Sequence, residues 1–212
     1  MISIKAFEFN YFQENTFVLY DETREAVIID CGCCRREEEI ELENFITENN
    51  LIVKHLLCTH LHLDHIFGNP FVYKKYGLKP QAHRLDVELL PSPDAQAKLF
   101  GLSFHIENIP VEKLLVGNEI IKFGKSELKV LTIPGHSPGS VAFYNEKNGF
   151  VIVGDALFAG SIGRTDLWEG NHDILIAAIN DKLMTLPDET VVYPGHGPET
   201  RIIDEKLNNP YL

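Results

Sequence analysis

The sequence contains no long apolar run. Across its 212 residues there is no stretch of about 18 uninterrupted apolar side chains, so no membrane-spanning helix is expected. Residues 1–10 also lack the basic segment, apolar run and small-residue cleavage site of a secretory signal. We therefore expect a cytoplasmic protein that has no membrane partner.

Basic residues are few. Lysine and arginine number 19 against 31 aspartates and glutamates, which gives a formal net charge of −12 at pH 7. An acidic surface of this size argues against a large nucleic-acid footprint, although local basic groups can still hold an anionic substrate. The length and a hydrophobic content of 44% are ordinary for a globular protein, and we expect residues 1–212 to form a single domain. The sequence does not indicate an oligomeric state.

Cysteine is also scarce, with four residues at Cys31, Cys33, Cys34 and Cys58. Three of them lie within four positions, which is too close for a normal disulfide framework, and a cytoplasmic location keeps thiols reduced. A soft-metal site would need a second cysteine or histidine pair with zinc-finger spacing, and none accompanies them. We interpret the three as a turn of small residues after the apolar run at residues 26–29.

Hydrophobic patterning predicts groups of strands separated by helices. β-Branched and aromatic runs predict strands at residues 15–20, 26–30, 51–59, 119–123, 128–133, 140–144, 150–153 and 190–193. Helical patterns cover residues 35–49, 64–76, 84–100, 173–186 and 199–207, with glycine or proline interrupting the second and third. A glycine-rich loop covers residues 154–170. This grouping predicts an α/β fold, with two sheets covered by helices on their outer faces.

Four potential metal ligands lie within six residues. His60, His62, Asp64 and His65 come at the end of the apolar strand at residues 51–59. In an extended chain His60 and His62 point to one side, whereas the adjacent Asp64 and His65 aim in different directions. Ligands this dense can hardly all reach one metal ion, but they can divide between two. The cluster is the first indication of a binuclear site.

Three further candidates share one sequence context. His136, Asp155 and His196 each follow a predicted strand and lie beside glycine, in the segments PGHSPG, GD and PGHGP. Glycine permits tight turns and close backbone approach, and loops at a rigid sheet edge commonly carry sites. We therefore expect these side chains to complete the site. Isolated histidines are more often structural or surface residues, and we interpret four in this way: His55, His83, His105 and His172.

The types of ligand indicate the metal and its chemistry. Imidazole and carboxylate together suit zinc, iron or manganese, and the absence of cysteine from the set leaves iron open. Two cations about 3.5–4 Å apart can share a hydroxide as nucleophile while they polarise a carbonyl or phosphoryl oxygen. Zinc lowers the pKa of bound water to about 7. We expect two divalent metal ions, zinc foremost, with iron and manganese as alternatives.

The pattern H-x-H-x-D-H, followed by His136, Asp155 and His196, resembles the signature of the metallo-β-lactamase superfamily. The resemblance runs from about residue 15 to the end of the sequence. It implies an αββα sandwich of two mixed sheets with the site at one edge. It also implies two ligand sets joined by a bridging Asp155: His60, His62 and His136 for the first metal, and Asp64, His65 and His196 for the second.

Residues 154–166, GDALFAGSIGRTD, look like the glyoxalase II and persulfide dioxygenase branch, and residues 205–212 resemble the ending of short glyoxalase II-like proteins. Glyoxalase II hydrolyses S-2-hydroxyacylglutathione, typically S-D-lactoylglutathione. The resemblance implies that a metal-held hydroxide attacks the thioester and that the second metal helps the thiolate leave. Asp64 would be catalytic, because it would orient the hydroxide. Arg164 would contact a glutathione carboxylate, unless it pairs instead with Asp166.

The sequence departs from glyoxalase II in three places. It lacks the additional C-terminal helical region, which supplies part of the glutathione site. Asp166 stands where the full-length enzymes have a tyrosine that contacts glutathione, and the cysteine-rich turn at residues 31–34 replaces a Pro-Gly or Gly-Gly turn. The first two departures put glutathione recognition in question.

Several alternatives share these ligands. A persulfide dioxygenase on the same fold uses one iron held by the equivalents of His60, His136 and Asp155. Lactonase-like hydrolases and non-catalytic metal modules also remain. Secreted β-lactamases are disfavoured, because they are exported and many carry cysteine at the position of Asp155. RNA-processing hydrolases are disfavoured by the acidic charge.

Overall fold

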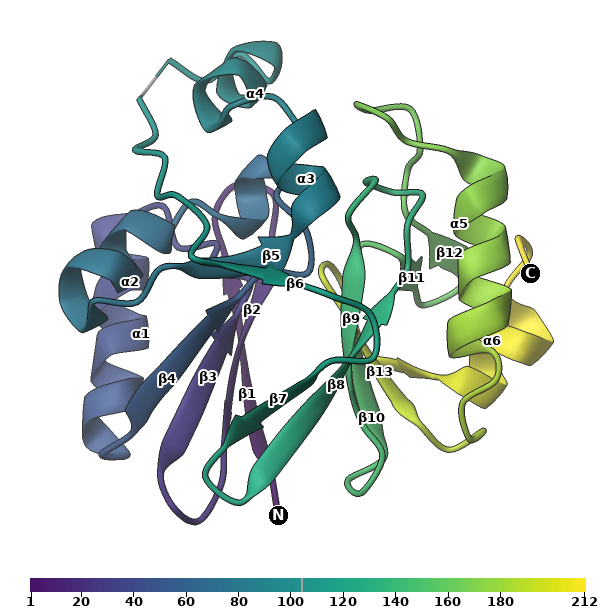
Figure 1. Cartoon of the computed structure of the whole chain (residues 1–212), viewed down its shortest axis with the longest axis horizontal. Coiled ribbons are helices and arrows are strands. Elements are labelled where there is room, and N and C mark those ends of the chain that lie inside the picture. Colours follow the sequence, from purple (N-terminus) through teal and green to yellow (C-terminus); the bar gives the residue numbers. More distant parts are fainter. Residues whose placement is uncertain (104) are drawn as a thin grey trace.

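Two sheets face each other, and helices cover their outer sides (Figure 1). The computed structural model describes residues 1–103 and 105–212, and within these residues each of the two sheets has six strands. Both sheets are mixed, with parallel and antiparallel pairs. This arrangement confirms the layered α/β fold that the sequence predicts.

The first sheet is built from the N-terminal half of the chain. Its strands lie in sequence order: β1 (Ser3–Phe9), β2 (Glu14–Tyr20), β3 (Glu25–Ile29), β4 (Ile52–Leu57), β5 (Pro80–His83) and β6 (Lys113–Leu115). Strands β1 to β3 pair antiparallel and β3 to β6 pair parallel. The helices of this half are α1 (Arg36–Glu48), α2 (Asn69–Tyr76), α3 (Arg84–Leu89) and α4 (Pro93–Leu99), with a 3-10 turn at Leu63–His65.

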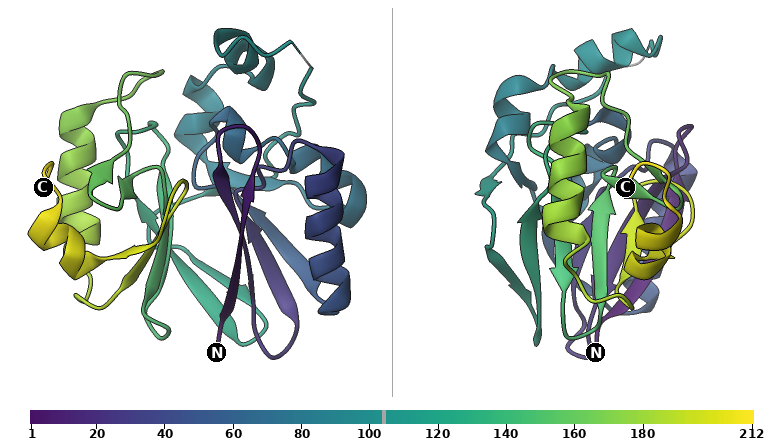
Figure 2. Two further views of the ribbon diagram at one scale, coloured as in Figure 1. Left: turned by 180° about the vertical axis from the view of Figure 1, so that it is seen from behind. Right: turned by 90° about the vertical axis from the view of Figure 1, so that its right-hand side faces the viewer.

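The second sheet is built from the C-terminal half. Its order is β14 (Thr200–Arg201), β13 (Val191–Pro194), β10 (Phe150–Gly154), β9 (Val141–Asn145), β8 (Ser126–Thr132) and β7 (Ile120–Phe123). A small separate hairpin joins β11 (Leu157–Phe158) to β12 (Ser161–Ile162). Helix α5 (His172–Ala178), its π-helical continuation at Ile179–Leu183 and α6 (Ile202–Asn208) cover the outer face of this sheet (Figure 2).

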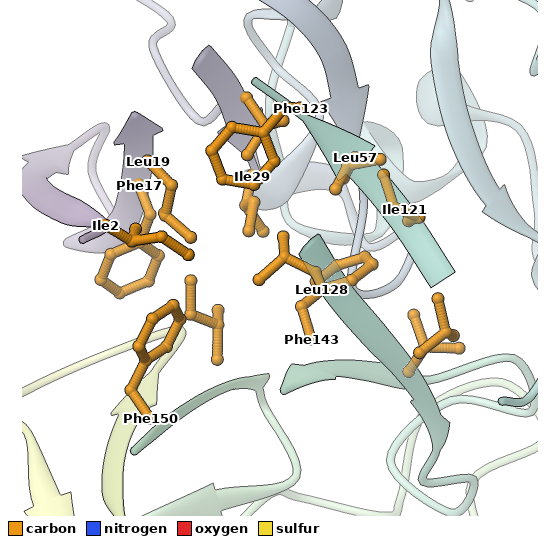
Figure 3. Packing of buried hydrophobic residues seen from close by; sticks show 14 of the residues in the cluster. Ile2, Phe17, Leu19, Ile29, Leu57, Ile121, Phe123, Leu128, Phe143 and Phe150 are labelled. Atoms are coloured by element: carbon orange, nitrogen blue, oxygen red, sulfur yellow. The ribbon is translucent and has the colours of Figure 1, made fainter. Parts of the chain in front are cut away.

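The main core lies between the two sheets (Figure 3). Side chains from alternate positions of β2, β3 and β4 meet side chains of β7 to β10 there, as the period of a strand requires. Val27 and Ile29 point into this core, whereas Ala26 and Ile28 pack beneath α1 with Leu42. Strand β3 is therefore buried on both faces, which explains the uninterrupted apolar run at residues 26–29.

Several short elements differ from the sequence-based prediction. The strand expected at residues 51–59 ends at Leu57, and the helix expected at 173–186 passes into a π-helical turn after Ala178. Strands β1, β5, β6, β11, β12 and β14 are additional. None of the helices in the described residues is long and apolar enough to cross a membrane.

Candidate metal centre

All seven predicted ligands meet at one edge of the sandwich. They lie on loops that follow β4, β8, β10 and β13, at the carboxyl ends of these strands. The backbone around them is tightly packed: Gly154 has φ +52°, and a Cβ at this position would lie 2.7 Å from the Cβ of Thr59. Glycine before Asp155 therefore lets the loop after β10 approach the loop after β4.

The first trio is His60, His62 and His136, all of them buried. His136 Nε2 lies 2.8 Å from His62 Nδ1 and 3.2 Å from His60 Nε2. Three imidazole nitrogens that converge this closely make a ligand set of the kind that zinc and iron accept.

The second trio is Asp64, His65 and His196. Asp64 Oδ2 lies 3.1 Å from His196 Nε2 and 3.8 Å from His65 Nε2. His65 is fully buried, whereas the side chains of Asp64 and His196 are partly exposed. The second trio therefore lies on the more solvent-exposed side of the centre.

Asp155 lies between the two trios. Its Oδ1 atom is 3.3 Å from His65 Nε2, and its Oδ2 atom is 3.6 Å from His136 Nε2 and 3.5 Å from His196 Nε2. One carboxylate thus contacts ligands of both sets. This is the placement that a bridge between two cations requires.

The polar atoms at the centre of this arrangement fit a metal. Among the described residues, Asp155 Oδ1 and His65 Nε2 are buried atoms without a hydrogen-bond partner, although they lie 3.3 Å apart. Leaving such atoms unsatisfied costs free energy, typically about 1–3 kcal/mol each. A cation between them would satisfy both.

The outer nitrogens of the histidines are held by hydrogen bonds. His136 Nδ1 lies 2.8 Å from the carbonyl oxygen of Arg164, and His196 Nδ1 lies 3.0 Å from that of Phe12. His65 Nδ1 lies 3.1 Å from Asp30 Oδ2. An imidazole that donates from Nδ1 keeps its lone pair on Nε2, so these contacts direct the ligand nitrogen to the centre.

Burial keeps the first trio neutral. It lowers the pKa of His62 to about 3 and also lowers the pKa of His60 and of His136, with repulsion from the neighbouring imidazoles adding to the effect at His60 and His62. Neutral imidazole is the form that binds a metal. The first trio is therefore ready to bind at neutral pH.

The second trio is more strongly coupled to carboxylates. Burial opposes a charge on His65, but Asp155 and Asp64 outweigh it and raise the pKa of His65 well above its usual value. Burial likewise opposes ionisation of Asp155, yet His65 and His136 hold the pKa of this carboxyl well below its usual range. Binding of a cation at His65 must therefore displace a proton.

Sequence reasoning missed several buried groups around the site. Asp30 packs against His65, and it accepts hydrogen bonds from the Thr59 N–H at 2.7 Å and from Thr59 Oγ1 at 2.6 Å. Glu14 is fully buried, with Oε1 lying 3.9 Å from His65 Nδ1. Asp30 could have been recognised, because it follows strand β3 at the same edge as the other ligands.

The residues interpreted as structural lie outside the trios. His55 contacts Gln81, His83 accepts from the Leu85 N–H, and His105 and His172 pair with nearby aspartates. The cysteines are free thiols, and Cys31 Sγ lies 3.6 Å from Cys33 Sγ. The hydrogen bond with Cys33, together with burial, raises the pKa of Cys31, and burial raises the pKa of Cys58. They are therefore poor nucleophiles.

The predicted substrate residue Arg164 lies at the rim of the site. Its backbone carbonyl is bonded to His136, but its guanidinium pairs with Asp166. The structure thus shows the ion pair that the sequence offered as the alternative to a substrate contact.

Half-buried aromatic rings border both trios. The Trp168 ring centre lies 5.9 Å from that of His62 and 6.4 Å from that of Phe100. On the other side, the Phe158 ring centre lies 6.3 Å from that of His196. These rings give the rim apolar surface, which the sequence analysis did not anticipate.

Comparisons with known proteins agree on one family. The model described as "Metallo-beta-lactamase superfamily" matches residues 10–196. The "Probable metallo-hydrolase YqgX" of Bacillus subtilis is 35% identical over 200 residues, covering 94% of this chain and 92% of its own. The "Hydroxyacylglutathione hydrolase GloC" of Haemophilus influenzae is 35% identical over 202 residues, covering 95% and 93%.

Solved structures share the fold. The BLEG-1 B3 metallo-beta-lactamase has a TM-score of 0.89 at 34% identity and covers 99% of both chains. TTHA1623 in a di-iron-bound form has a TM-score of 0.85 at 35% identity, covering 98% of this chain and 100% of its own. ETHE1 from Myxococcus xanthus has a TM-score of 0.78 at 27% identity, covering 98% and 83%.

Proposed function

This chain belongs to the metallo-beta-lactamase superfamily, and on that premise we propose that it is a binuclear metal-dependent thioesterase acting on S-2-hydroxyacylglutathione or a related thioester. The observation that carries the proposal is the position of Asp155, whose two carboxylate oxygens face ligands of both trios. A single ion held by His60, His136 and Asp155 would leave the second trio of Asp64, His65 and His196 beside the same carboxylate without a ligand role.

His60, His62 and His136 would hold the first cation, Asp64, His65 and His196 the second, and Asp155 would bridge them. We propose zinc for both positions. The ions would supply a water of lowered pKa and an electrophile for the carbonyl oxygen. Net hydrolysis adds water across the C–S bond and releases a carboxylic acid and a thiol.

The protein's own groups would orient the reactants. The pKa of Asp64 is lowered, because nearby His65 and His196 outweigh the effect of its burial. Asp64 is therefore a carboxylate at neutral pH, and it can accept a hydrogen bond from the attacking water and fix its direction. If the thiol leaves towards the second trio, the acyl group lies beside the first, against the rings of Trp168 and Phe100.

Glutathione is proposed as the thiol because of the likeness to GloC, which is named as a hydroxyacylglutathione hydrolase. The test is the hydrolysis of S-D-lactoylglutathione by zinc-loaded protein, measured by release of free thiol. We expect a kcat/KM of about 10⁴ M⁻¹s⁻¹ or more. Turnover that is indistinguishable from the metal-free protein would contradict the proposed substrate.

A single-iron persulfide dioxygenase is the second candidate, because residues 154–166 resemble that branch as well, and the likeness to ETHE1 at 27% identity is compatible with it. Iron-loaded protein should then consume oxygen with glutathione persulfide, whereas the zinc form should not. The chain is also similar to the BLEG-1 B3 metallo-beta-lactamase at 34% identity, so hydrolysis of a β-lactam should be measured beside these two substrates. A higher kcat/KM for glutathione persulfide or for the β-lactam than for the thioester would contradict the proposed function.

A further inference from the structure

A carboxylate that is not a ligand lies behind the first trio. Asp86, on helix α3, is 1% exposed. Its Oδ2 atom accepts hydrogen bonds from the Leu61 N–H at 2.9 Å and from Ser137 Oγ at 3.0 Å. Its Oδ1 atom accepts from the Gly139 N–H at 2.6 Å. One side chain therefore joins two separate loops.

These two loops carry all three histidines of the first trio. Leu61 lies between His60 and His62 in the chain, and Ser137 directly follows His136. His60 and His136 are 76 positions apart in sequence, yet their Nε2 atoms lie 3.2 Å from each other. Asp86 holds the Leu61 N–H on one loop, and the Ser137 hydroxyl and Gly139 N–H on the other, so these bonds bear on the spacing of the three nitrogens.

The second trio is tied by different groups. Asp30 contacts His65 Nδ1 at 3.1 Å, and the Phe12 carbonyl contacts His196 Nδ1 at 3.0 Å. The carbonyl oxygen of Asp64 accepts from Asn10 Nδ2 at 3.0 Å. Asp30 also reaches the first trio, because Thr59 Oγ1, which donates to it, lies 3.0 Å from His60 Nδ1. Among the described residues, the Asp86 carboxylate, by contrast, bonds only to the two loops that carry the first trio.

The fit around Asp86 requires an ionised, short side chain. A Cβ built on Gly139 would lie 2.6 Å from Asp86 Oδ1, so the loop can approach only because that residue is glycine. Burial raises the pKa of Asp86 to about 6, and the three hydrogen bonds limit the rise. Only a carboxylate offers two oxygens that accept on both sides at once, whereas an amide offers one.

We propose that Asp86 is a positioning residue that sets the affinity of the first trio for its metal ion without touching the ion. This inference rests on the proposed binuclear function. Substitution of groups that orient metal ligands typically lowers metal affinity about 10- to 100-fold. The loss should be confined to one half of the centre.

The experiment measures each trio separately by substituting one ligand of the other trio. His196→Ala removes a ligand of the second trio only, and His62→Ala removes one of the first trio only. Asp86→Asn is then introduced into each background, and Zn²⁺ affinity is measured by calorimetry, with Co²⁺ absorption as a second readout. We expect a loss of about 10- to 100-fold in the His196→Ala background and little change in the His62→Ala background.

Two further variants separate positioning from folding. Ser137→Ala removes one of the three bonds to Asp86, and it should give a smaller loss with the same dependence on background. Asp21→Asn is the matched control, because Asp21 is also a buried carboxylate that accepts from backbone N–H groups and hydroxyls. Asp21 follows strand β2, about 20 Å along that strand from Glu14. It should lower thermal stability without changing Zn²⁺ affinity.

Equal losses in both backgrounds, or no loss in the His196→Ala background, would overturn the role of Asp86. A fall in thermal stability alone would do the same, because it would match the Asp21 control. If the unaltered chain fails to bind Zn²⁺ at all, the metal centre and the proposed function fail first, which is a different result from loss of the positioning effect.

Discussion

Arg164 and Asp166 form a bidentate ion pair at the rim of the metal centre. Arg164 Nε lies 2.7 Å from Asp166 Oδ1, and Nη2 lies 2.9 Å from Oδ2. Both side chains are exposed, at 54% and 69%. Exposed pairs of this kind typically contribute about 0.2–1 kcal/mol, so a substrate carboxylate can compete for the guanidinium.

This competition makes a prediction about substrate binding. Asp166→Asn should lower KM for S-D-lactoylglutathione by up to about fivefold, because it frees Arg164. Arg164→Ala should raise KM more than it lowers kcat, because the contact is made equally in the ground and transition states. Steady-state kinetics of both variants checks this. If neither variant changes KM, Arg164 has a structural role only.

Asp155 should be required for both cations. Asp155→Ala removes the one carboxylate that faces both trios, so metal content should fall at both positions and hydrolysis should be lost. His196→Ala, which affects the second trio only, is the matched comparison and should retain close to one ion. Elemental analysis after gel filtration gives the ion count. Two retained ions with normal turnover in Asp155→Ala would contradict the bridging role.

The seven proposed ligands were accessible to sequence reasoning because each lies just beyond a strand. His136, Asp155 and His196 share the same strand–glycine–ligand context, and the carboxyl ends of their strands meet at one edge of the sandwich. The resemblance to a known family then supplied the division into two sets. Spacing alone indicated two metals but did not assign each ligand.

The supporting carboxylates were not accessible in the same way. Asp86 has no distinctive neighbours in sequence, and its partners Leu61 and Ser137 are 25 and 51 positions away. Glu14 lies directly before the strand predicted at residues 15–20, where an exposed carboxylate is the ordinary expectation. Their roles depend on tertiary contacts, which a local pattern does not encode.

The short strands escaped prediction for a related reason. Strand β5, Pro80–His83, is mostly buried but carries a proline, a glutamine and a histidine, so it shows neither alternation nor an apolar run. Its neighbours β4 and β6 supply the pairing that holds it extended. Tertiary context decided the structure there, against a weak local preference.

Asp21 should stabilise the fold in a pH-dependent manner. Burial opposes its ionisation, but hydrogen bonds from Thr23 and Ser126 and from backbone N–H groups lower the pKa of Asp21 from 3.8 to about 2. A lowered pKa in the folded state adds stability above about pH 4, and this contribution is lost as the pH falls towards 2. Asp21→Asn should therefore be less stable than the parent at neutral pH, with the difference shrinking in acid.

Urea denaturation between pH 2 and 7, with a chelator present so that metal release does not contribute, measures this difference. Asp181→Asn changes an exposed aspartate of the π-helical turn and should leave the profile unchanged. A constant difference between Asp21→Asn and the parent at every pH would show that ionisation of Asp21 does not stabilise the fold.

Trp168 should select the acyl group of the substrate. Its half-buried ring lies beside His62 of the first trio, and Phe100 extends the same apolar surface. A phenyl group on the acyl chain would pack against these rings, and an aromatic contact is worth about 0.5–1.5 kcal/mol beyond its buried area. Trp168→Ala should therefore lower kcat/KM for S-mandeloylglutathione about two- to tenfold more than for S-D-lactoylglutathione.

Phe158→Ala is the matched control for this prediction, because the Phe158 ring borders His196 on the second trio instead. If the thiol leaves on that side, removal of the Phe158 ring should change kcat/KM for both thioesters by the same factor, because both contain the same thiol. Trp168 is the single tryptophan of the chain, so binding of mandelate can also be followed directly by its fluorescence. Mandelate should change that emission more than lactate does. An equal effect of Trp168→Ala on both thioesters would place the acyl group away from this ring.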